Sequence, residues 1–88
     1  MNPNFKAEFD EDWLKFWKKV PHNMKLRIKR KIDKIISNPK GRHLRHGLDF
    51  FVAEVGQYRI VYRIFENDRK VRFYFVGKHK EYEKWYSS

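Results

Sequence analysis

Three β-rich segments follow one another in the second half of the chain, and they constrain its fold more than any other feature. Residues 48–55 (LDFFVAEV), 58–65 (YRIVYRIF) and 70–77 (KVRFYFVG) are rich in β-branched and aromatic side chains, which favour strands. Gly56-Gln57 separates the first two segments, and the polar stretch ENDRK separates the last two. Because connections this short join neighbouring antiparallel strands, the pattern predicts a meander.

The first half of the chain predicts one strand and the beginning of a helical region. Apolar side chains alternate along residues 4–9, which is typical of a short strand. Asp10 is a suitable N-cap for a first helix that ends near Val20, because Pro21 disfavours helical geometry in the residue before it. The apolar side chains of this helix recur at helical spacing at Trp13, Phe16, Trp17 and Val20.

A second helix is predicted from about Pro21 to Ser37, where the sequence NPKG stops it. Almost no loop joins the two helices, so we expect them to form an antiparallel hairpin. The tail, residues 79–88, is expected to form a helical turn or an added strand. The predicted fold class is α+β: an antiparallel meander sheet of about four strands, packed on an N-terminal helix hairpin, in the order β-α-α-β-β-β.

Composition and charge limit the function. The chain has 88 residues, which we interpret as one domain spanning residues 1–88, and it has no cysteine. No apolar run has membrane-spanning length and no signal peptide is recognisable, so we expect a cytoplasmic protein without a membrane partner. The net charge is +10, of which residues 22–46 supply +8. This basic block favours a polyanionic partner, most often nucleic acid, although solvated lysines on a helix or an acidic protein partner also explain it.

Arg59 and Arg63 share one face of the second β-rich segment. On a sheet face that no helix covers, two arginines could clamp a phosphate. The alternative is an ordinary solvent-facing strand with a cross-strand ion pair, for instance between Arg59 and Glu54, which lies just before the Gly56-Gln57 turn.

The C-terminal segment offers further candidates. His79, flanked by Lys78 and Lys80, could act as an acid or a base in RNA cleavage, although a lone histidine is more often inert. Tyr82, Trp85 and Tyr86 could stack on unpaired bases, or cover the sheet; we expect one of the three to cover it. We predict no metal site and no cofactor, because no carboxylate or cysteine joins His43 and His46 and the sequence has no phosphate-cradling glycine motif.

The order of these segments, with the Gly-x-Tyr-Arg-Ile-x-Tyr core beginning at Gly56, resembles the RelE/ParE superfamily of toxins from toxin–antitoxin pairs. The resemblance also includes Asn38-Pro39, residues 43–48 (HLRHGL) and the final VGKHKEY, and it covers nearly the whole chain. It implies the toxin of a type II toxin–antitoxin system. The RelE-like branch, which we favour, cuts mRNA in the ribosomal A site without a metal, through attack of the 2′-hydroxyl that leaves a cyclic phosphate.

The resemblance also implies roles for individual residues. Arg59 matches the family arginine that stabilises the phosphate in the transition state, and His79 lies near a family general acid. Tyr82, or else Tyr86, matches a tyrosine that orients the substrate. Glu54 stands where RelE proteins usually carry a basic residue, so its part as a base is open. The expected contacts with RNA phosphates, in mRNA or ribosomal RNA, are Lys25, Arg27, Lys29, Arg30, Lys34, Arg45, Arg63, Lys78 and Lys80.

Two alternatives remain within the same superfamily. The chain could be a ParE-like inhibitor of DNA gyrase without nuclease activity, or an inactive remnant that only binds an antitoxin. Each toxin hypothesis implies an acidic, partly disordered antitoxin as partner, and therefore a hetero-oligomer, for which a strongly basic surface is complementary.

Overall fold

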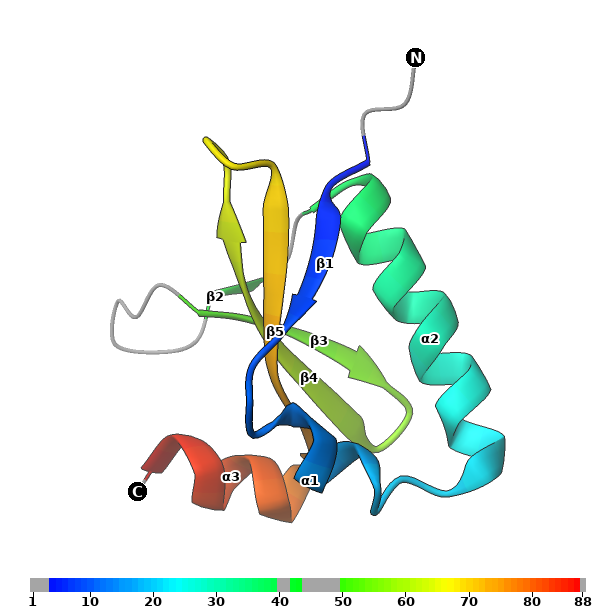
Figure 1. Cartoon of the computed structure of the whole chain (residues 1–88). Helices are drawn as coiled ribbons and strands as arrows, with labels where there is room; N and C mark the ends of the chain where they lie inside the picture. The colour runs from blue at the N-terminus through cyan, green and yellow to red at the C-terminus, as the bar shows by residue number, and fades with distance from the viewer. Residues whose placement is uncertain (1–3, 40–41, 44–49, 88) are drawn as a thin grey trace.

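A five-stranded sheet forms the centre of the protein. The structure, a computed structural model, describes residues 4–39, 42–43 and 50–87. The strands are β1 (Lys6–Phe9), β2 (Arg42–His43), β3 (Phe51–Val55), β4 (Tyr58–Phe65) and β5 (Lys70–Lys78), in the order β1-β5-β4-β3-β2 (Figure 1). The antiparallel meander of β3, β4 and β5 is confirmed.

The sheet also differs from the prediction in two respects. β1 lies parallel to β5 at one edge, and the short β2 adds a fifth strand at the other edge. The α+β class and the element order are as predicted, but the sheet is mixed. A hairpin turn would force antiparallel pairing, whereas the helices that follow β1 carry the chain away before the meander begins and leave the direction of β1 unconstrained.

Three helices flank the sheet: α1 (Trp13–Trp17), α2 (His22–Ser37) and α3 (His79–Ser87). The predicted N-cap at Asp10 is wrong, because α1 begins only at Trp13 and its N-cap is Asp12, without a side-chain cap hydrogen bond. Asp10 instead accepts a hydrogen bond from the backbone N–H of Asp12 at 3.1 Å, in the turn before the helix. α1 packs mainly against β5 and α2 against β1 and β3 (Figure 1). The two helices follow each other as predicted, but they do not pack on each other as an antiparallel hairpin, because α1 is short and each helix makes its main contacts with the sheet.

The larger hydrophobic core lies between α2 and one face of the sheet. Ile28, Ile32 and Ile35 lie on the buried side of α2, at the spacing of one helix face. They belong to the same cluster as Ile60 and Tyr62 of β4, both fully buried. Burial raises the pKa of Tyr62 to about 12, so this hydroxyl stays neutral at physiological pH.

A second, smaller core lies on the opposite face of the same strands. Val61 and Phe75 are almost completely buried there, beneath Tyr82 and Trp85 of α3. The register between β4 and β5 shifts next to Val61, so that Tyr74 is an extra residue of β5. The tail is therefore a helix, which was one of its two expected forms, and it covers part of the sheet face that carries the smaller core.

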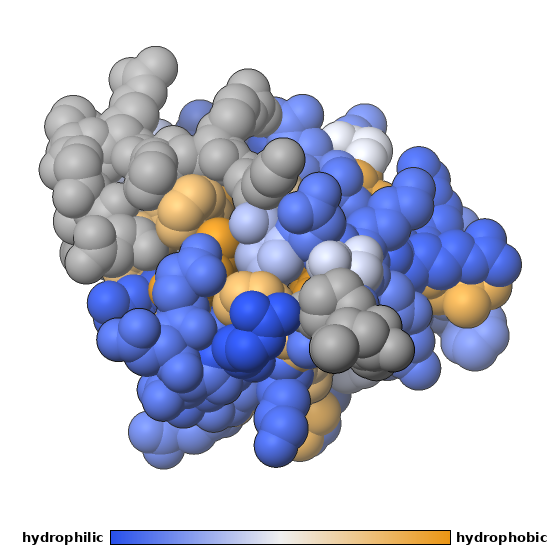
Figure 2. Space-filling view, turned by 90° about the horizontal axis from the view of Figure 1, so that it is seen from above, coloured by the Kyte–Doolittle hydropathy of each residue, from blue (hydrophilic) through white to orange (hydrophobic). Residues whose placement is uncertain are grey.

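The surface of the protein is mostly polar (Figure 2). The end of the molecule that carries the β4–β5 turn is mostly hydrophilic, and its hydrophobic residues form small separate areas (Figure 2). Leu14 and Leu26 are more than half exposed on the outer sides of α1 and α2. Single exposed apolar side chains of this kind are normal in soluble domains.

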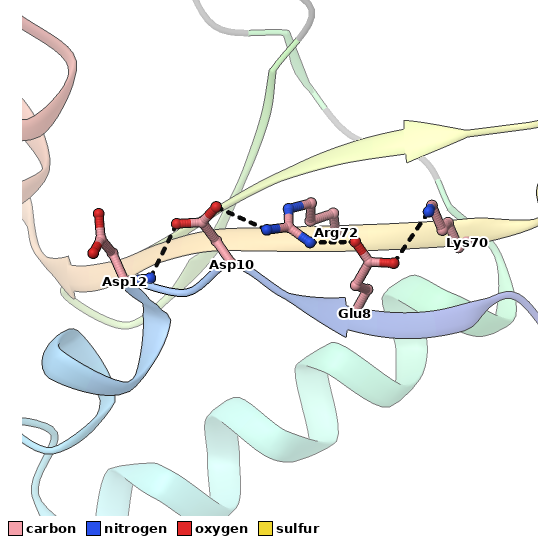
Figure 3. Close-up of polar contacts among 5 residues, drawn as sticks. All are labelled: Glu8, Asp10, Asp12, Lys70 and Arg72. Carbon is pink, nitrogen blue, oxygen red and sulfur yellow. Dashed lines mark hydrogen bonds and ion pairs between the residues drawn. The ribbon is translucent and has the colours of Figure 1, made fainter.

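A network of charged side chains ties the parallel strand β1 to β5 (Figure 3). The Arg72 guanidinium binds Glu8, and it donates a second hydrogen bond to Asp10 at 3.0 Å, while Lys70 lies 3.1 Å from Glu8. Hydrogen bonds from Lys70 and Arg72 lower the pKa of Glu8. Burial raises the pKa of Asp10, but hydrogen bonds from the backbone N–H of Asp12 and from Arg72 outweigh it, and the net pKa is lowered.

The larger core predicts a clear contrast along α2. Ile28→Ala should lower the free energy of unfolding by about 2–5 kcal/mol, because it removes a fully buried side chain and leaves a cavity. Leu26→Ala on the outer side of the same helix should change it by no more than about 0.5 kcal/mol. Urea denaturation measures both, and equal effects would place α2 in a different orientation.

The charged network predicts acid sensitivity. Both carboxyl groups have lowered pKa values when folded, so their stabilisation is complete above their ordinary values of 4.5 and 3.8 and is lost as pH falls through the lowered values. Arg72→Gln should therefore make the urea midpoint less dependent on pH below about 4.5. Lys15→Gln, which removes an exposed pair with Asp12, is the control and should leave the acid dependence as in the wild type.

Candidate functional site

A groove of about 590 Å³ lies where the β3–β4 turn meets the beginning of α3. We call it the cationic groove; its lining consists of Gly56, Gln57, Arg59, Lys78, His79, Lys80 and Glu81. Four residues that the sequence analysis singled out, Arg59, Lys78, His79 and Lys80, thus lie around one concave surface. Clustered cations of this kind suit a phosphate group.

The strand register brings these residues together. β4 begins where β5 ends, so Tyr58 is paired with Lys78, and Arg59 with Gly77. The backbone N–H of His79 donates a hydrogen bond to the carbonyl of Gln57 at 3.1 Å. The first residue of α3 is therefore tied directly to the β3–β4 turn, which places the backbone of His79 close to the beginning of the strand that carries Arg59.

Two glycines make this corner possible. Gly56 has φ +59°, in the left-handed region that disfavours residues with a side chain. At Gly77 an added Cβ would lie 2.6 Å from Cζ of Phe75 and 3.3 Å from Cβ of Glu81. Glycine at this position lets α3 turn back closely over the sheet and cover the smaller core.

Arg59 is held by three groups. Its Nε lies 3.7 Å from Oε2 of Glu54, the residue directly opposite in the register, so the predicted cross-strand ion pair is confirmed. Its Nη1 donates to the carbonyls of Gly56 at 3.3 Å and Tyr58 at 3.2 Å. The side chain of Arg59 is 18% exposed and that of Glu54 47% exposed. The guanidinium is thus oriented at the rim of the groove.

His79 has a carboxylate partner on its own helix. Its Nε2 lies 2.8 Å from Oε2 of Glu83, one turn further along α3. Both side chains are about half exposed. A carboxylate in contact with one imidazole nitrogen orients the ring.

Tyr82 lies outside the lining of the cationic groove. Its ring packs against Phe75 at a centroid distance of 6.5 Å and against Tyr86 at 4.8 Å, and it lies 6.3 Å from the His79 ring. Trp85 also packs against Phe75. Two of the three tail aromatics therefore cover the sheet, where we expected one.

Arg63 lies farther along β4, outside the lining of the groove. It is paired in the register with Arg72, and its guanidinium lies over the rings of Phe50 and Phe65, with centroid distances of 5.7 and 5.0 Å. Cation–π contacts with two rings fix the side chain against the sheet.

The basic side of α2 meets the groove at the β3–β4 turn. A second hollow of about 340 Å³ is lined by Arg27, Arg30, Lys31, Lys34, Glu54, Val55 and Gly56. Gly56 lines both hollows, so the cations of α2 and of the cationic groove lie on either side of one turn. Lys25 lies over the ring of Trp17 at 5.3 Å, and Lys29 is exposed. Arg45, and most of the HLRHGL segment, lie outside the described residues.

Within residues 4–39, 42–43 and 50–87, no group of three or more His, Asp or Glu side chains could hold a metal ion. No helix of the described part of the chain is long and apolar enough to cross a membrane.

Comparison with known protein families decides the relationship. Residues 4–82 match the family described as the ParE toxin of the type II toxin–antitoxin system parDE. The chain belongs to this family. It is a toxin of the RelE/ParE superfamily of type II toxin–antitoxin systems, which confirms the resemblance found in the sequence. A comparison with curated protein sequences gave no significant match.

Solved structures of RelE proteins share the fold of this toxin. A chain of the intact RelBE toxin–antitoxin complex of E. coli is 26% identical, with a TM-score of 0.75, and the match covers 84% of this chain and 95% of that chain. A mutant of the E. coli toxin RelE in the free state is also 26% identical, with a TM-score of 0.77, and coverage of 93% and 90%. A chain of the RelBE2 complex of Mycobacterium tuberculosis is 21% identical, with a TM-score of 0.79, coverage of 86% and 92%, and shows the fold alone.

Three residues at or next to the cationic groove were not identified from the sequence. Gln57 and Glu81 line the groove, and Glu83 contacts His79. A signal existed only for Glu83, because a histidine and a glutamate four residues apart contact each other if the segment is helical. The tail was predicted only as a helical turn or a strand, so this pair could not be assigned. Gln57 lies in the β3–β4 turn and Glu81 in α3, and both line the groove only because the beginning of α3 packs against that turn, which depends on tertiary structure.

The close approach at Gly77 predicts strong coupling to Phe75. Gly77→Ala should lower the free energy of unfolding by about 1–3 kcal/mol, because the new methyl group overlaps Cζ of a buried ring. In a Phe75→Leu background, which lacks that atom, the same change should cost clearly less. Urea denaturation of the four proteins measures the coupling, and additive effects would contradict the predicted clash.

Proposed function

We propose that this toxin is a metal-independent endoribonuclease that cuts mRNA on the ribosome and so inhibits translation. The observation that carries the proposal is the cationic groove, in which Arg59, Lys78 and Lys80 line the same concave surface as His79. Cations positioned around a phosphate stabilise the charge that develops when it is attacked. The likeness to E. coli RelE at 26% identity supports the same function.

The proposed reaction uses the RNA's own 2′-hydroxyl as the nucleophile. The 2′-oxygen attacks the adjacent phosphorus, the bond from phosphorus to the 5′-oxygen breaks, and the products are a 2′,3′-cyclic phosphate and a free 5′-hydroxyl. Arg59 and the two lysines would bind the non-bridging oxygens. His79, held by Glu83, would donate a proton to the leaving 5′-oxygen, and Glu54, next to Arg59, would accept the proton of the 2′-hydroxyl.

The basic side of α2 would contact ribosomal RNA. Arg27, Arg30 and Lys34 line a hollow that adjoins the cationic groove at Gly56, so a polyanion could cross both. Binding of this kind is largely electrostatic and should weaken as salt concentration rises.

A cognate antitoxin is the proposed regulatory partner. The similar chain of E. coli comes from a RelBE toxin–antitoxin complex. A net charge of +10 is complementary to an acidic protein, which would bind rapidly and neutralise the basic surface.

Inhibition of DNA gyrase is the second candidate. The matching family is the ParE toxin family, and Glu54 places a carboxylate against the arginine that would otherwise bind phosphate. In that case the chain shares only the fold with the RelE nucleases, and the cationic groove has no catalytic task.

The nuclease proposal predicts that two substitutions stop cleavage without unfolding the protein. In a cell-free translation system, purified toxin should cut a translated message, as mapped by primer extension. Arg59→Ala and His79→Ala should each reduce the cleavage rate about 100-fold or more, because each removes a charge-stabilising or proton-donating group. The melting temperature should change little, since both side chains form partly exposed ion pairs.

Arg69→Asn is the matched control, because it removes an arginine from the β4–β5 turn and asparagine tolerates the φ of +48° at that position. It should leave cleavage unchanged. A parallel supercoiling assay separates the alternatives. Intact mRNA with failing gyrase activity supports the ParE-like function, and no effect in either assay supports an inactive remnant.

A further inference from the structure

An apolar hollow of about 280 Å³ lies next to the cationic groove. It is formed between the end of α1, the α1–α2 connection and the end of β5, and Phe16, Val20, Pro21, Tyr58 and Val76 contribute to its apolar walls. Lys78 and Glu81 line both this hollow and the cationic groove. The two depressions are therefore neighbours that share a common border.

The walls of the apolar hollow are held by the two cores. The rings of Phe16 and Phe75 meet edge to face at a centroid distance of 4.8 Å. Tyr58 is 8% exposed and Val76 2% exposed, so both are anchored in the packed interior. Pro21, whose ring restricts φ, limits the movement of the remaining wall. A hollow built in this way is preformed and loses little entropy when a ligand enters.

The border of the hollow combines opposite charges. Lys19 and Lys78 supply positive charge, and Glu81 supplies a carboxylate. A ligand with an apolar, planar body, an anionic group for the lysines and an N–H group for the carboxylate would complement this lining. A nucleotide has all three, because its base presents an aromatic face and its amino group donates hydrogen bonds.

We propose that the apolar hollow is a base-binding subsite, which receives the nucleobase next to the phosphate held in the cationic groove. The base packs against Phe16 and Tyr58, and Glu81 accepts a hydrogen bond from an exocyclic amino group. Adenine, cytosine and guanine carry such a group, and uracil does not. The proposal rests on the proposed function in RNA cleavage and adds a residue, Glu81, that determines base preference.

An acidic peptide is the less suitable occupant. The volume of about 280 Å³ lies just below the usual range of ligand pockets and suits one planar ring better than several side chains.

The direct test adds AMP, UMP or inorganic phosphate to the whole toxin and measures the NMR chemical shifts of its backbone amides. AMP should shift the signals of Val20 and Val76 in the hollow together with those of Arg59 and His79. Phosphate should shift only the groove signals. AMP should bind about tenfold more tightly than UMP, and Glu81→Gln should abolish that difference.

Glu66→Gln, in the β4–β5 turn, is the matched control and should retain the preference. Identical shift maps for AMP and phosphate would overturn the subsite, as would an unchanged preference in Glu81→Gln. The subsite would also be overturned if a peptide of the antitoxin, rather than any nucleotide, shifted the hollow signals.

A cleavage map separates this proposal from the nuclease itself. If AMP fills the hollow but translated mRNA stays intact, the subsite stands and the nuclease proposal fails. If mRNA is cut with the same base preference by the wild type and by Glu81→Gln, the nuclease stands and the subsite fails. We expect instead that Glu81→Gln cuts mRNA at the same total rate as the wild type but selects the base beside the cut less strongly.

Discussion

Burial of β4 and β5 on both faces is the constraint on which the rest of the structure depends. Tyr62 and Phe73 are completely buried in the larger core, to which α1 and α2 contribute, while Val61 and Phe75, on the same two strands, are buried in the smaller core beneath α3. A slip of one residue would move every side chain to the wrong face, so two cores together fix the register strongly. That register sets Arg59 opposite Gly77 and places Lys78 beside the β3–β4 turn. The groove is thus a consequence of core packing rather than of local loop conformation.

The parts of the fold that follow from local sequence periodicity could be predicted. The spacing of Ile28, Ile32 and Ile35 is sufficient to define the buried side of α2, because a helix brings these residues to one face. The two-residue turn at Gly56 similarly places Glu54 opposite Arg59, since a tight hairpin fixes which residues face each other. The charge of α2 could be counted directly, but its position next to the groove could not.

The parts that depend on tertiary packing could not be predicted. β1 is joined to the meander only through helices, and nothing in its own residues indicates that it pairs with β5 in parallel. The sequence around Tyr82 and Trp85 is equally compatible with rings that stack on a ligand and with rings that cover Phe75. Only the turn at Gly77, which folds α3 over the sheet, decides between the two roles. The contact between His79 and Glu83 follows from that same helix.

The distribution of ion pairs explains how a strongly basic protein can keep an accessible cationic site. On β5, Arg72 is neutralised by Glu8 and Asp10 and serves to hold β1. Arg59 has a looser partner, because Glu54 is 3.7 Å away and about half exposed. Exposed pairs of this kind contribute about 0–1 kcal/mol, whereas hydrogen bonds to charged groups contribute about 1.5–3 kcal/mol. Glu54 therefore orients Arg59 in the free protein, and a phosphate that reaches the guanidinium through two hydrogen bonds would displace the carboxylate.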